Sequence, residues 1–440
     1  MVGGLTSSRA VLGMLALTLA AVPGYAQMDS DKPDPRRMDA AKIVTDPNPM
    51  SDPKGENDID RVSDSYQPKG IELGDFLLLP QIEIEESYNS NIYAQKQGAK
   101  GDFITTVRPE MKLRSQTKQH AFNTLAYLDY KHFWTYSNDD VLDGEIFADG
   151  RYDINSTTNL NASVDFISRH EERGTSDDIE GDEPTPTRSY AATLGGKTQQ
   201  GKYIFEASSG VTYRDFDDVA TSAGTMINND DRDRTELLGS LRGAYEMFPG
   251  YAAVAKLTGN SRWYDSQRDD SGLARDSYGF RAEAGLGVDL TQLIRGDFLV
   301  GYLHQDYSDP SFADPSGLSF KAAFNWTPSR MTLVVPALER SVEETTLTSA
   351  SAIVRSSATL LVRHELARNI LLAGFAGVYY DEYEGTPYTS LTAETNFRVT
   401  YAFTPEVYLS GQVGYKKKDS DVPDSSYDQA VVGLRLGFRY

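Results

Sequence analysis

Charged side chains recur at every second position along several long segments of this chain, with apolar side chains between them. One stretch places Arg108 and Lys112 in alternation with Val107 and Met111. The charged residues that we expect to share one polar surface are Arg108, Lys112, Arg281, Glu283, Arg355, Glu394, Arg398, Arg435 and Arg439. A ring that carries both signs of charge orders water and small polar solutes and sets ion selectivity. The alternative is that individual members pair across neighbouring strands and only hold a wall together.

The segments that carry these residues are predicted to be long β-strands. Successive strand residues point to opposite faces, so an alternation of period two gives one apolar and one polar face. The same alternation places further charges on polar faces: Glu110, Asp129, Lys131, Asp149, Arg151, Asp165, Arg363 and Glu406. Strands of about ten residues match a tilted membrane crossing, whereas soluble strands are nearer five or six. The charged faces must point inward, because an Arg or Lys that faces lipid at the midplane costs about 2–4 kcal/mol.

Connections between the segments alternate between short and long. Short ones are expected near 155–156, 199–201, 248–250, 327–329 and 404–405, and long polar ones at 171–187, 215–233, 265–275 and 416–426. Bacterial barrels have short periplasmic turns and longer outside loops. Counting segments from Phe76 to Tyr440 gives about 18, an even number as a single-chain barrel of this type needs. We therefore predict an all-β protein: a transmembrane, antiparallel, up-and-down β-barrel of about 18 strands whose polar lumen holds water.

The first 72 residues differ from the rest. Residues 1–26 resemble an export signal, because Arg9 precedes an apolar run of about a dozen residues and Ala26 offers a small residue for cleavage. Residues 27–72 are rich in Pro, Asp and Lys, and such a segment buries too little apolar surface to offset its ordering entropy. We predict a signal peptide, then a disordered periplasmic tail, then a barrel over 73–440. The alternatives are an uncleaved anchor and a docking segment for a periplasmic partner.

Composition excludes several classes of function. The net charge of −21 disfavours nucleic acid, since phosphate neutralisation needs an excess of Lys and Arg. The chain has no Cys, which rules out a disulfide framework. Its five His are scattered over separate segments, and no local spacing suggests a catalytic or metal site. We expect no enzymatic activity, no metal and no cofactor, with an outer-membrane barrel enzyme as the disfavoured alternative.

Two stretches resemble known sequences. In the first, 79–93, the positions that carry the resemblance are Pro80, Ile82, Tyr88, Asn91 and Tyr93, preceded by Gly74 and Asp75. This stretch resembles the opening strand of the family named "putative β-barrel porin" in Gram-negative bacteria, which is often linked to exopolysaccharide clusters. The closing residues Leu436, Phe438 and Tyr440 resemble the C-terminal assembly signal of outer-membrane barrels. Neither motif identifies a substrate.

These observations lead to one hypothesis and two alternatives. We expect a porin-like channel of the cell outer membrane for passive passage of small polar solutes, with a role in exopolysaccharide export as a further option. The alternatives are a non-conducting scaffold barrel of a polysaccharide secretion system and the barrel enzyme above. The expected partners are outer-membrane lipid and lipopolysaccharide, the barrel assembly machinery and polysaccharide export proteins.

Overall fold

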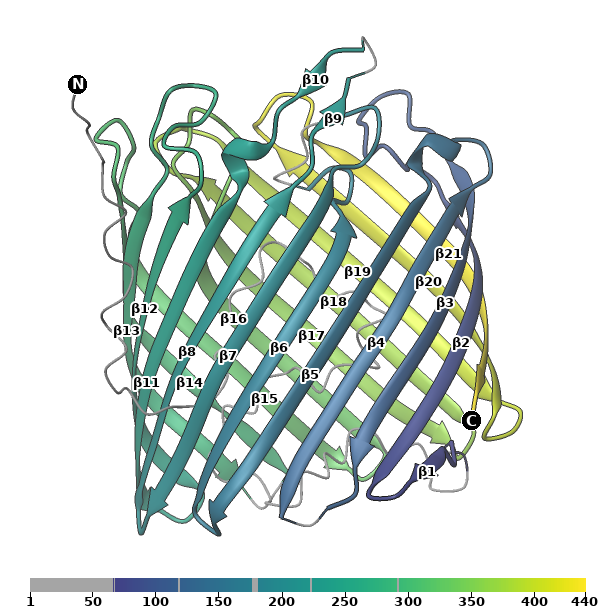
Figure 1. The fold of residues 1–440 in the computed structure, drawn as a ribbon, viewed down its shortest axis with the longest axis vertical. Coiled ribbons are helices and arrows are strands. Elements are labelled where there is room, and N and C mark those ends of the chain that lie inside the picture. The colour runs from purple at the N-terminus through teal and green to yellow at the C-terminus, as the bar shows by residue number, and fades with distance from the viewer. Residues whose placement is uncertain (1–65, 67, 118, 176–180, 222–223, 291–292) are drawn as a thin grey trace, which may run out of the picture.

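The computed structural model describes residue 66 and residues 68–117, 119–175, 181–221, 224–290 and 293–440. The predicted signal peptide (1–26) and the predicted tail up to residue 65 lie outside the described residues. Figure 1 shows the described chain as one closed barrel of tilted strands.

Eighteen antiparallel strands form the barrel wall. They are β2 (Phe76–Asn89), β3 (Asp102–Ser115), β4 (His120–Phe133), β5 (Val141–Asn155), β6 (Thr158–His170), β7 (Pro186–Gln200), β8 (Tyr203–Phe216), β11 (Arg234–Phe248), β12 (Tyr251–Tyr264), β13 (Ser277–Leu290), β14 (Ile294–Tyr307), β15 (Ser316–Ser329), β16 (Thr332–Glu343), β17 (Ile353–Ala367), β18 (Ile370–Tyr383), β19 (Thr389–Ala402), β20 (Val407–Ser420) and β21 (Tyr427–Arg439). The predicted fold class and strand number are confirmed.

Pairing of the last wall strand with the first closes the barrel. In β21 and β2, Arg439 lies opposite Gln81 and Val431 opposite Asn89. Every other wall strand pairs with the wall strands before and after it in the chain, which makes the topology up-and-down. Closure leaves no unpaired edge, and a membrane requires this because lipid cannot hydrogen-bond free backbone groups.

Within the described part of the chain, three short strands and two 3₁₀ turns lie outside this wall. Strand β1 (Ile71–Leu73) pairs with the start of β2, so strand pairing is already present just before the predicted barrel boundary at residue 73. Strands β9 (Val219–Ala220) and β10 (Met226–Ile227) form a hairpin that projects from the top of the barrel in Figure 1. The 3₁₀ turns are Ser137–Asp139 and Asp230–Arg232.

The connections alternate in length, as predicted. The short turns are 116–119, 156–157, 201–202, 249–250, 291–293, 330–331, 368–369 and 403–406. The longer loops are 90–101, 134–140, 171–185, 217–233, 265–276, 308–315, 344–352, 384–388 and 421–426. In Figure 1 the short turns lie at the bottom with the C-terminus, and the longer loops lie at the top.

One predicted loop was placed wrongly. Residues 416–420, expected at the start of a long loop, are the end of β20, and Lys418 lies opposite Tyr427 in the ladder. The hairpin continues past the apolar band because backbone pairing needs only a partner strand, whatever the side chains. The true loop is 421–426.

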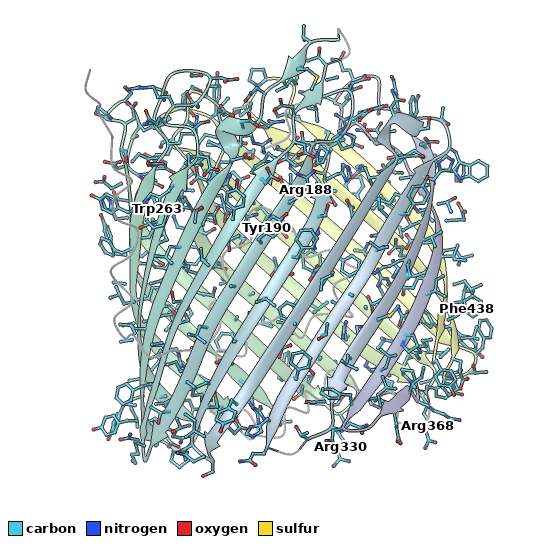
Figure 2. All side chains as sticks on the ribbon, in the orientation of Figure 1. Arg188, Tyr190, Trp263, Arg330, Arg368 and Phe438 are labelled. Atoms are coloured by element: carbon cyan, nitrogen blue, oxygen red, sulfur yellow. The ribbon has the colours of Figure 1, made fainter. Side chains whose placement is uncertain are left out.

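The outer face of the wall is apolar. Leu434 is 54% exposed, whereas its neighbour Arg435 on the opposite face is 4% exposed. Outward aromatic residues gather towards both ends of the strands, and Figure 2 shows Trp263 and Tyr190 towards the loop end and Phe438 nearer the short turns. Two such belts suit the interfaces of a bilayer. Among the described residues, no helix is long and apolar enough to cross a membrane.

Candidate functional site

All nine predicted charged residues lie at inward-facing positions of the wall strands, on β3, β13, β17, β19 and β21. They alternate there with the exposed apolar residues of the outer face. The structure does not gather them into one cluster. It distributes eight of them over three groups of ion pairs and hydrogen bonds, on the seam between β21 and β2 with its neighbours, on β13–β16, and on β17–β20.

The first group joins the two ends of the barrel. Arg435 of β21 contacts Glu85 of β2 through Nη2 and Oε2 at 2.5 Å, and Glu83 through Nη1 and Oε2 at 3.2 Å. Gln412 donates Nε2 to Glu85 Oε1 at 2.6 Å, and the Tyr408 hydroxyl donates to Glu83. All three charges are nearly buried, so each depends on the others for compensation.

The group continues onto β3 and β4. Arg108 Nη2 lies 3.2 Å from Glu110 Oε2, and Arg108 Nη1 lies 3.8 Å from Asp129 Oδ2. Its guanidinium stacks 3.7 Å above the ring of Tyr127. Lys112 Nζ lies 2.9 Å from Glu110 Oε1. Arg108 is thus held on the wall, while Lys112, whose side chain is 33% exposed, is the more accessible cation.

The second group crosses β13 to β16. Arg281 Nη1 lies 3.2 Å from Glu339 Oε1, and Lys321 Nζ lies 3.0 Å from the same oxygen. Glu283 accepts a hydrogen bond of 2.6 Å from the Ser319 hydroxyl. Arg281 and Glu283, both predicted to line the lumen, therefore contact residues of other strands.

The third group lies on β17 to β20. Arg355 donates two hydrogen bonds to Asp381, from Nε to Oδ1 at 2.7 Å and from Nη2 to Oδ2 at 2.9 Å. Glu394 accepts a hydrogen bond from the Tyr379 hydroxyl at 2.8 Å. Arg398 donates to the amide oxygen of Gln412 at 3.0 Å, which links this group to the seam.

Arg439 differs from the other eight because it lies at the rim with the short turns. Its Nε donates to the Pro405 carbonyl at 2.8 Å, and its Nη2 donates to the Tyr66 carbonyl at 2.9 Å. The prediction of Glu406 as a lumen residue was wrong, because Glu406 belongs to the turn 403–406 between β19 and β20. Strand β19 ends at Ala402, so the alternation that was extrapolated to Glu406 stops before it.

Inward-facing glycines make room for the polar side chains of neighbouring strands. A Cβ at Gly287 would lie 2.8 Å from Asp297 Oδ1, and one at Gly433 would lie 3.0 Å from Glu85 Oε1. Asp297 in turn receives two hydrogen bonds of 3.1 Å from Arg242, which reaches it from β11 across two intervening strands. Long side chains can therefore lie flat along the wall.

Sequence reasoning did not select Glu83, Glu85 or Tyr408, although they complete the seam. The signal for the two glutamates was present, because they alternate with Ile82 and Ile84 in the opening strand. Tyr408 could not have been found from alternation alone, since its role depends on the closure that brings β20, β21 and β2 together.

The loop between β16 and β17 folds over the inner side of the barrel mouth. Glu344 accepts a hydrogen bond of 2.6 Å from the Tyr264 hydroxyl and pairs with Arg262, both on β12. Arg275 of the loop 265–276 donates to the Thr345 carbonyl at 3.3 Å. Ser351 is 1% exposed. The loop therefore crosses from β16 towards β12 and is packed rather than solvated.

The described part of the loop 171–185 makes contacts on the other side of the mouth. Arg173 Nη2 lies 2.9 Å from Asp139 Oδ1, and Lys418 of β20 donates to the Gly174 carbonyl at 3.3 Å. Glu171 pairs with Arg232 of the loop 217–233. Loops far apart in the sequence are thus tied to one another by charge.

The loops 217–233 and 265–276 carry an acidic group whose members repel one another. Burial, together with the charges of Asp215, Asp230 and Asp265, raises the pKa of Asp233 to about 6. The Phe216 N–H donates to Asp233 Oδ1 at 2.8 Å and opposes this shift. No three His, Cys, Asp or Glu side chains are arranged to hold a metal ion anywhere in the described residues.

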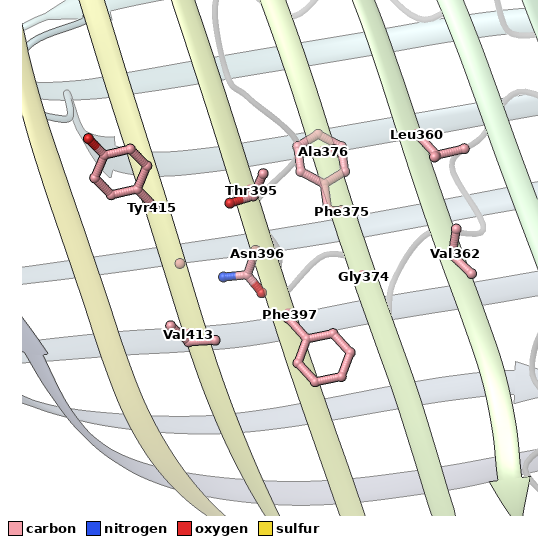
Figure 3. Close-up of a pocket in the computed structure, with 11 residues that line it drawn as sticks. Leu360, Val362, Gly374, Phe375, Ala376, Thr395, Asn396, Phe397, Val413 and Tyr415 are labelled. Atoms are coloured by element: carbon pink, nitrogen blue, oxygen red, sulfur yellow. The ribbon is translucent and has the colours of Figure 1, made fainter.

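A groove of about 390 Å³ lies away from these charges, on the outer face of β17–β20. Figure 3 shows its lining, which includes Leu360, Val362, Phe397, Val413 and Tyr415. Almost all of this surface is apolar, and it belongs to the side of the wall that suits lipid. The groove is therefore no site for a polar solute.

Leu436, Phe438 and Tyr440, the residues of the predicted assembly signal, share the outer face of β21 and its end. Phe438 lies between Ile82 of β2 and Val407 of β20 in the ladder, and it is 42% exposed. Their placement is compatible with recognition from outside the barrel, and the assembly role stays a prediction.

The chain is similar to several solved structures. OccK3 (OpdO) of Pseudomonas aeruginosa has a TM-score of 0.40 and 13% identity, over 82% of this chain and 95% of that chain. OpdK of the same organism, crystallised with vanillate, has a TM-score of 0.40 and 8% identity, over 82% and 99%. A mutant of the P. aeruginosa ferric enterobactin receptor PfeA has a TM-score of 0.42 and 6% identity, over 82% and 80%.

Comparison with curated proteins gave no match. The model of the family described as "Putative beta-barrel porin 2" matches residues 64–440, which include the whole barrel wall. This match confirms the family resemblance expected from the opening strand, and the chain belongs to the putative beta-barrel porin 2 family.

Proposed function

We propose that this protein is a porin-like channel of the outer membrane through which small polar solutes pass passively. The observation that carries the proposal is the closed wall of eighteen strands with both signs of charge on its inner face. Barrels of 16–18 strands leave an aqueous channel, whereas barrels of about eight strands are filled by side chains. Membership of a porin family supports the same function and an outer-membrane location.

The test is single-channel conductance of refolded protein in a planar bilayer. Folding is checked first by heat-modifiable migration on a gel, since a closed barrel resists detergent until it is heated. We expect stable conductance steps that scale with salt concentration. A folded barrel that never conducts would overturn the proposal and would favour the non-conducting scaffold.

Passage of exopolysaccharide is the finer form of the proposal. Its support is the resemblance of the stretch 79–93 to a family often linked to exopolysaccharide clusters, together with the polar inner wall. Soluble polysaccharide fragments added to a conducting channel should then cause transient blocks. A channel that conducts salt but is never blocked by the fragments would contradict this finer form and leave the general channel intact.

The expected partners are part of the proposal as well. Lipid and lipopolysaccharide would contact the apolar outer face, and the barrel assembly machinery would recognise the last strand. Polysaccharide export proteins would be partners only under the finer form. We propose no catalytic step and no cofactor.

A further inference from the structure

Lys256 stands apart from the other cations of the inner wall. It faces inward on β12, opposite Arg242 of β11 and Glu283 of β13 in the ladder. Within the described residues its ammonium makes no hydrogen bond and no ion pair, whereas every other inward-facing Lys or Arg of the wall strands has a polar or ring contact. The Lys256 ammonium is therefore available to bind a group that is not part of the wall.

The charges around Lys256 do not balance. The groups whose fields act on it most strongly are Lys321, Glu283, Arg281 and Glu339. They comprise two further cations and two carboxylates, so one positive charge remains however the five groups pair. Arg281 and Lys321 both form ion pairs with Glu339, and Glu283 accepts a hydrogen bond from the Ser319 hydroxyl.

The neighbouring charges do not supply the missing anion. Arg242 contacts Asp297 at 2.9 Å and Glu206 at 3.4 Å. Lys197 lies opposite Glu206 in the ladder of β7 and β8, so this next group contains two cations and two carboxylates. The excess therefore stays with Lys256, Arg281 and Lys321.

An excess charge on the inner wall has a predictable consequence. Two opposite unit charges attract each other several times more strongly at the effective dielectric near a protein surface than in bulk water. A mobile anion that reaches the wall thus gains more there than in solution. Lys256 supplies an ammonium donor with three hydrogens, and Arg281 and Lys321 reinforce the field.

We propose that Lys256, assisted by Arg281 and Lys321, forms a binding site on the inner wall for the oxyanion group of a small solute, a carboxylate or a phosphate. As a site for permeating solutes it rests on the proposed channel function. Binding itself requires only that the solute reach the inner wall, so the two proposals can fail separately.

The first experiment measures protection of Lys256 in the full, folded protein. Lysines are acetylated briefly with limiting reagent, and modification is quantified by mass spectrometry in inorganic phosphate, in acetate, or in chloride of equal ionic strength. We expect phosphate or acetate to lower acetylation of Lys256 by about fivefold relative to chloride. Lys417, which faces outward and pairs with Asp419, is the internal control and should react equally in all three salts.

The second experiment measures ion selectivity across a bilayer with a salt gradient. Lys256→Gln should shift the reversal potential towards cation preference. Lys256→Arg and the outward Lys417→Gln should both leave the reversal potential unchanged. Equal acetylation of Lys256 in all three salts would overturn the site. Protection in a folded barrel that does not conduct would support the site and count against the channel.

Discussion

Glycines at single inward-facing positions leave space for large side chains of neighbouring strands on the inner wall. At Gly437 a Cβ would lie 2.1 Å from Cζ of Tyr408, whose hydroxyl donates to Glu83 at the seam. Glycine is usually a weak choice in a strand because it has no side chain to pack. Here it provides the space in which a large polar side chain from the next strand lies.

Gly437→Ala should therefore destabilise the barrel by about 1–3 kcal/mol, the usual cost of overpacking. The added methyl group displaces the Tyr408 ring and its bond to Glu83. The measurement is the denaturant midpoint of the refolded barrel in detergent. Gly411→Ala is the matched control, because a Cβ there meets nothing within 4 Å, and it should change stability by no more than about 0.5 kcal/mol. Equal effects of the two changes would contradict the steric explanation.

Asp233 predicts a particular dependence of stability on pH. Burial and neighbouring carboxylates raise its pKa to about 6 in the folded protein, from the usual value near 3.9. The folded state then binds the proton more tightly than the unfolded state does. The contribution of Asp233 to the stability of the folded state is fully present below about pH 4 and is lost as the pH rises to about 6. Asp233→Asn should flatten this part of the stability curve and make the protein more stable than wild type at pH 7.

Asp309 should affect the pH dependence of stability in the opposite direction, and it serves as the comparison for Asp233. The backbone N–H groups of Ser311 and Ala274 donate to its carboxylate and hold its pKa below the usual value. Its contribution is therefore present above about pH 4 and is lost as the pH falls through its lowered pKa. Unfolding midpoints of wild type, Asp233→Asn and Asp309→Asn between pH 3 and pH 8 would separate the two effects. Identical pH profiles of all three proteins would refute both assignments.

At the scale of elements, we predict that the last strand has a role in assembly beyond its contacts with lipid. Phe438 lies near the end of β21, close to the short turns. A charged residue on the lipid face costs only about 0–1 kcal/mol near the interface. A severe assembly defect from Phe438→Asp would thus exceed the cost of the lipid contact and would indicate that the position is recognised.

We expect Phe438→Asp to lower the amount of heat-modifiable barrel in the outer membrane severalfold. Phe403→Asp is the control, because Phe403 is exposed in the turn that follows β19 but does not belong to the last strand. It should reduce the barrel only slightly. Equal losses from the two changes would show that lipid contact, and not recognition of the C-terminus, determines the result.

The strands were the most predictable elements, and the reason is local. Strict alternation in the stretch 278–289 identifies both faces, because a residue pointing to lipid and a residue pointing to water must differ in polarity. Alternation loses its meaning where a strand leaves the membrane. This is why residues 416–420 were placed in a loop and Glu406 on the wall.

At the scale of the whole molecule, one loop lies over the inner side of the barrel mouth. The loop 344–352 is anchored to β12 through Glu344, and most of its residues are buried or half-buried. It therefore occupies space that a solute would otherwise cross. Its contact with β12, four strands away from β16, is a property of the closed barrel.

Replacing residues 345–351 by a two-residue Asn-Gly turn should widen the mouth and raise single-channel conductance, because this sequence favours a tight hairpin between β16 and β17. The control shortens the β9–β10 hairpin, which projects away from the barrel in Figure 1. That change should leave conductance unaltered. Unchanged conductance in the first variant would show that another part of the protein limits the flow.

The sequence by itself determined the fold class, the strand number and the inward direction of the charged faces. These depend on alternation and segment length, which are local properties imposed by lipid on one side and polar surroundings on the other. Only the tertiary structure decided which charges meet. Arg435 contacts Glu83 and Glu85 because the first and last strands close on each other. Lys256 makes no ion pair within the described residues, whereas Glu283 accepts a hydrogen bond from Ser319 and Glu339 pairs with Arg281 and Lys321. Such pairings join residues distant in the chain, and barrel closure alone sets the distances between them.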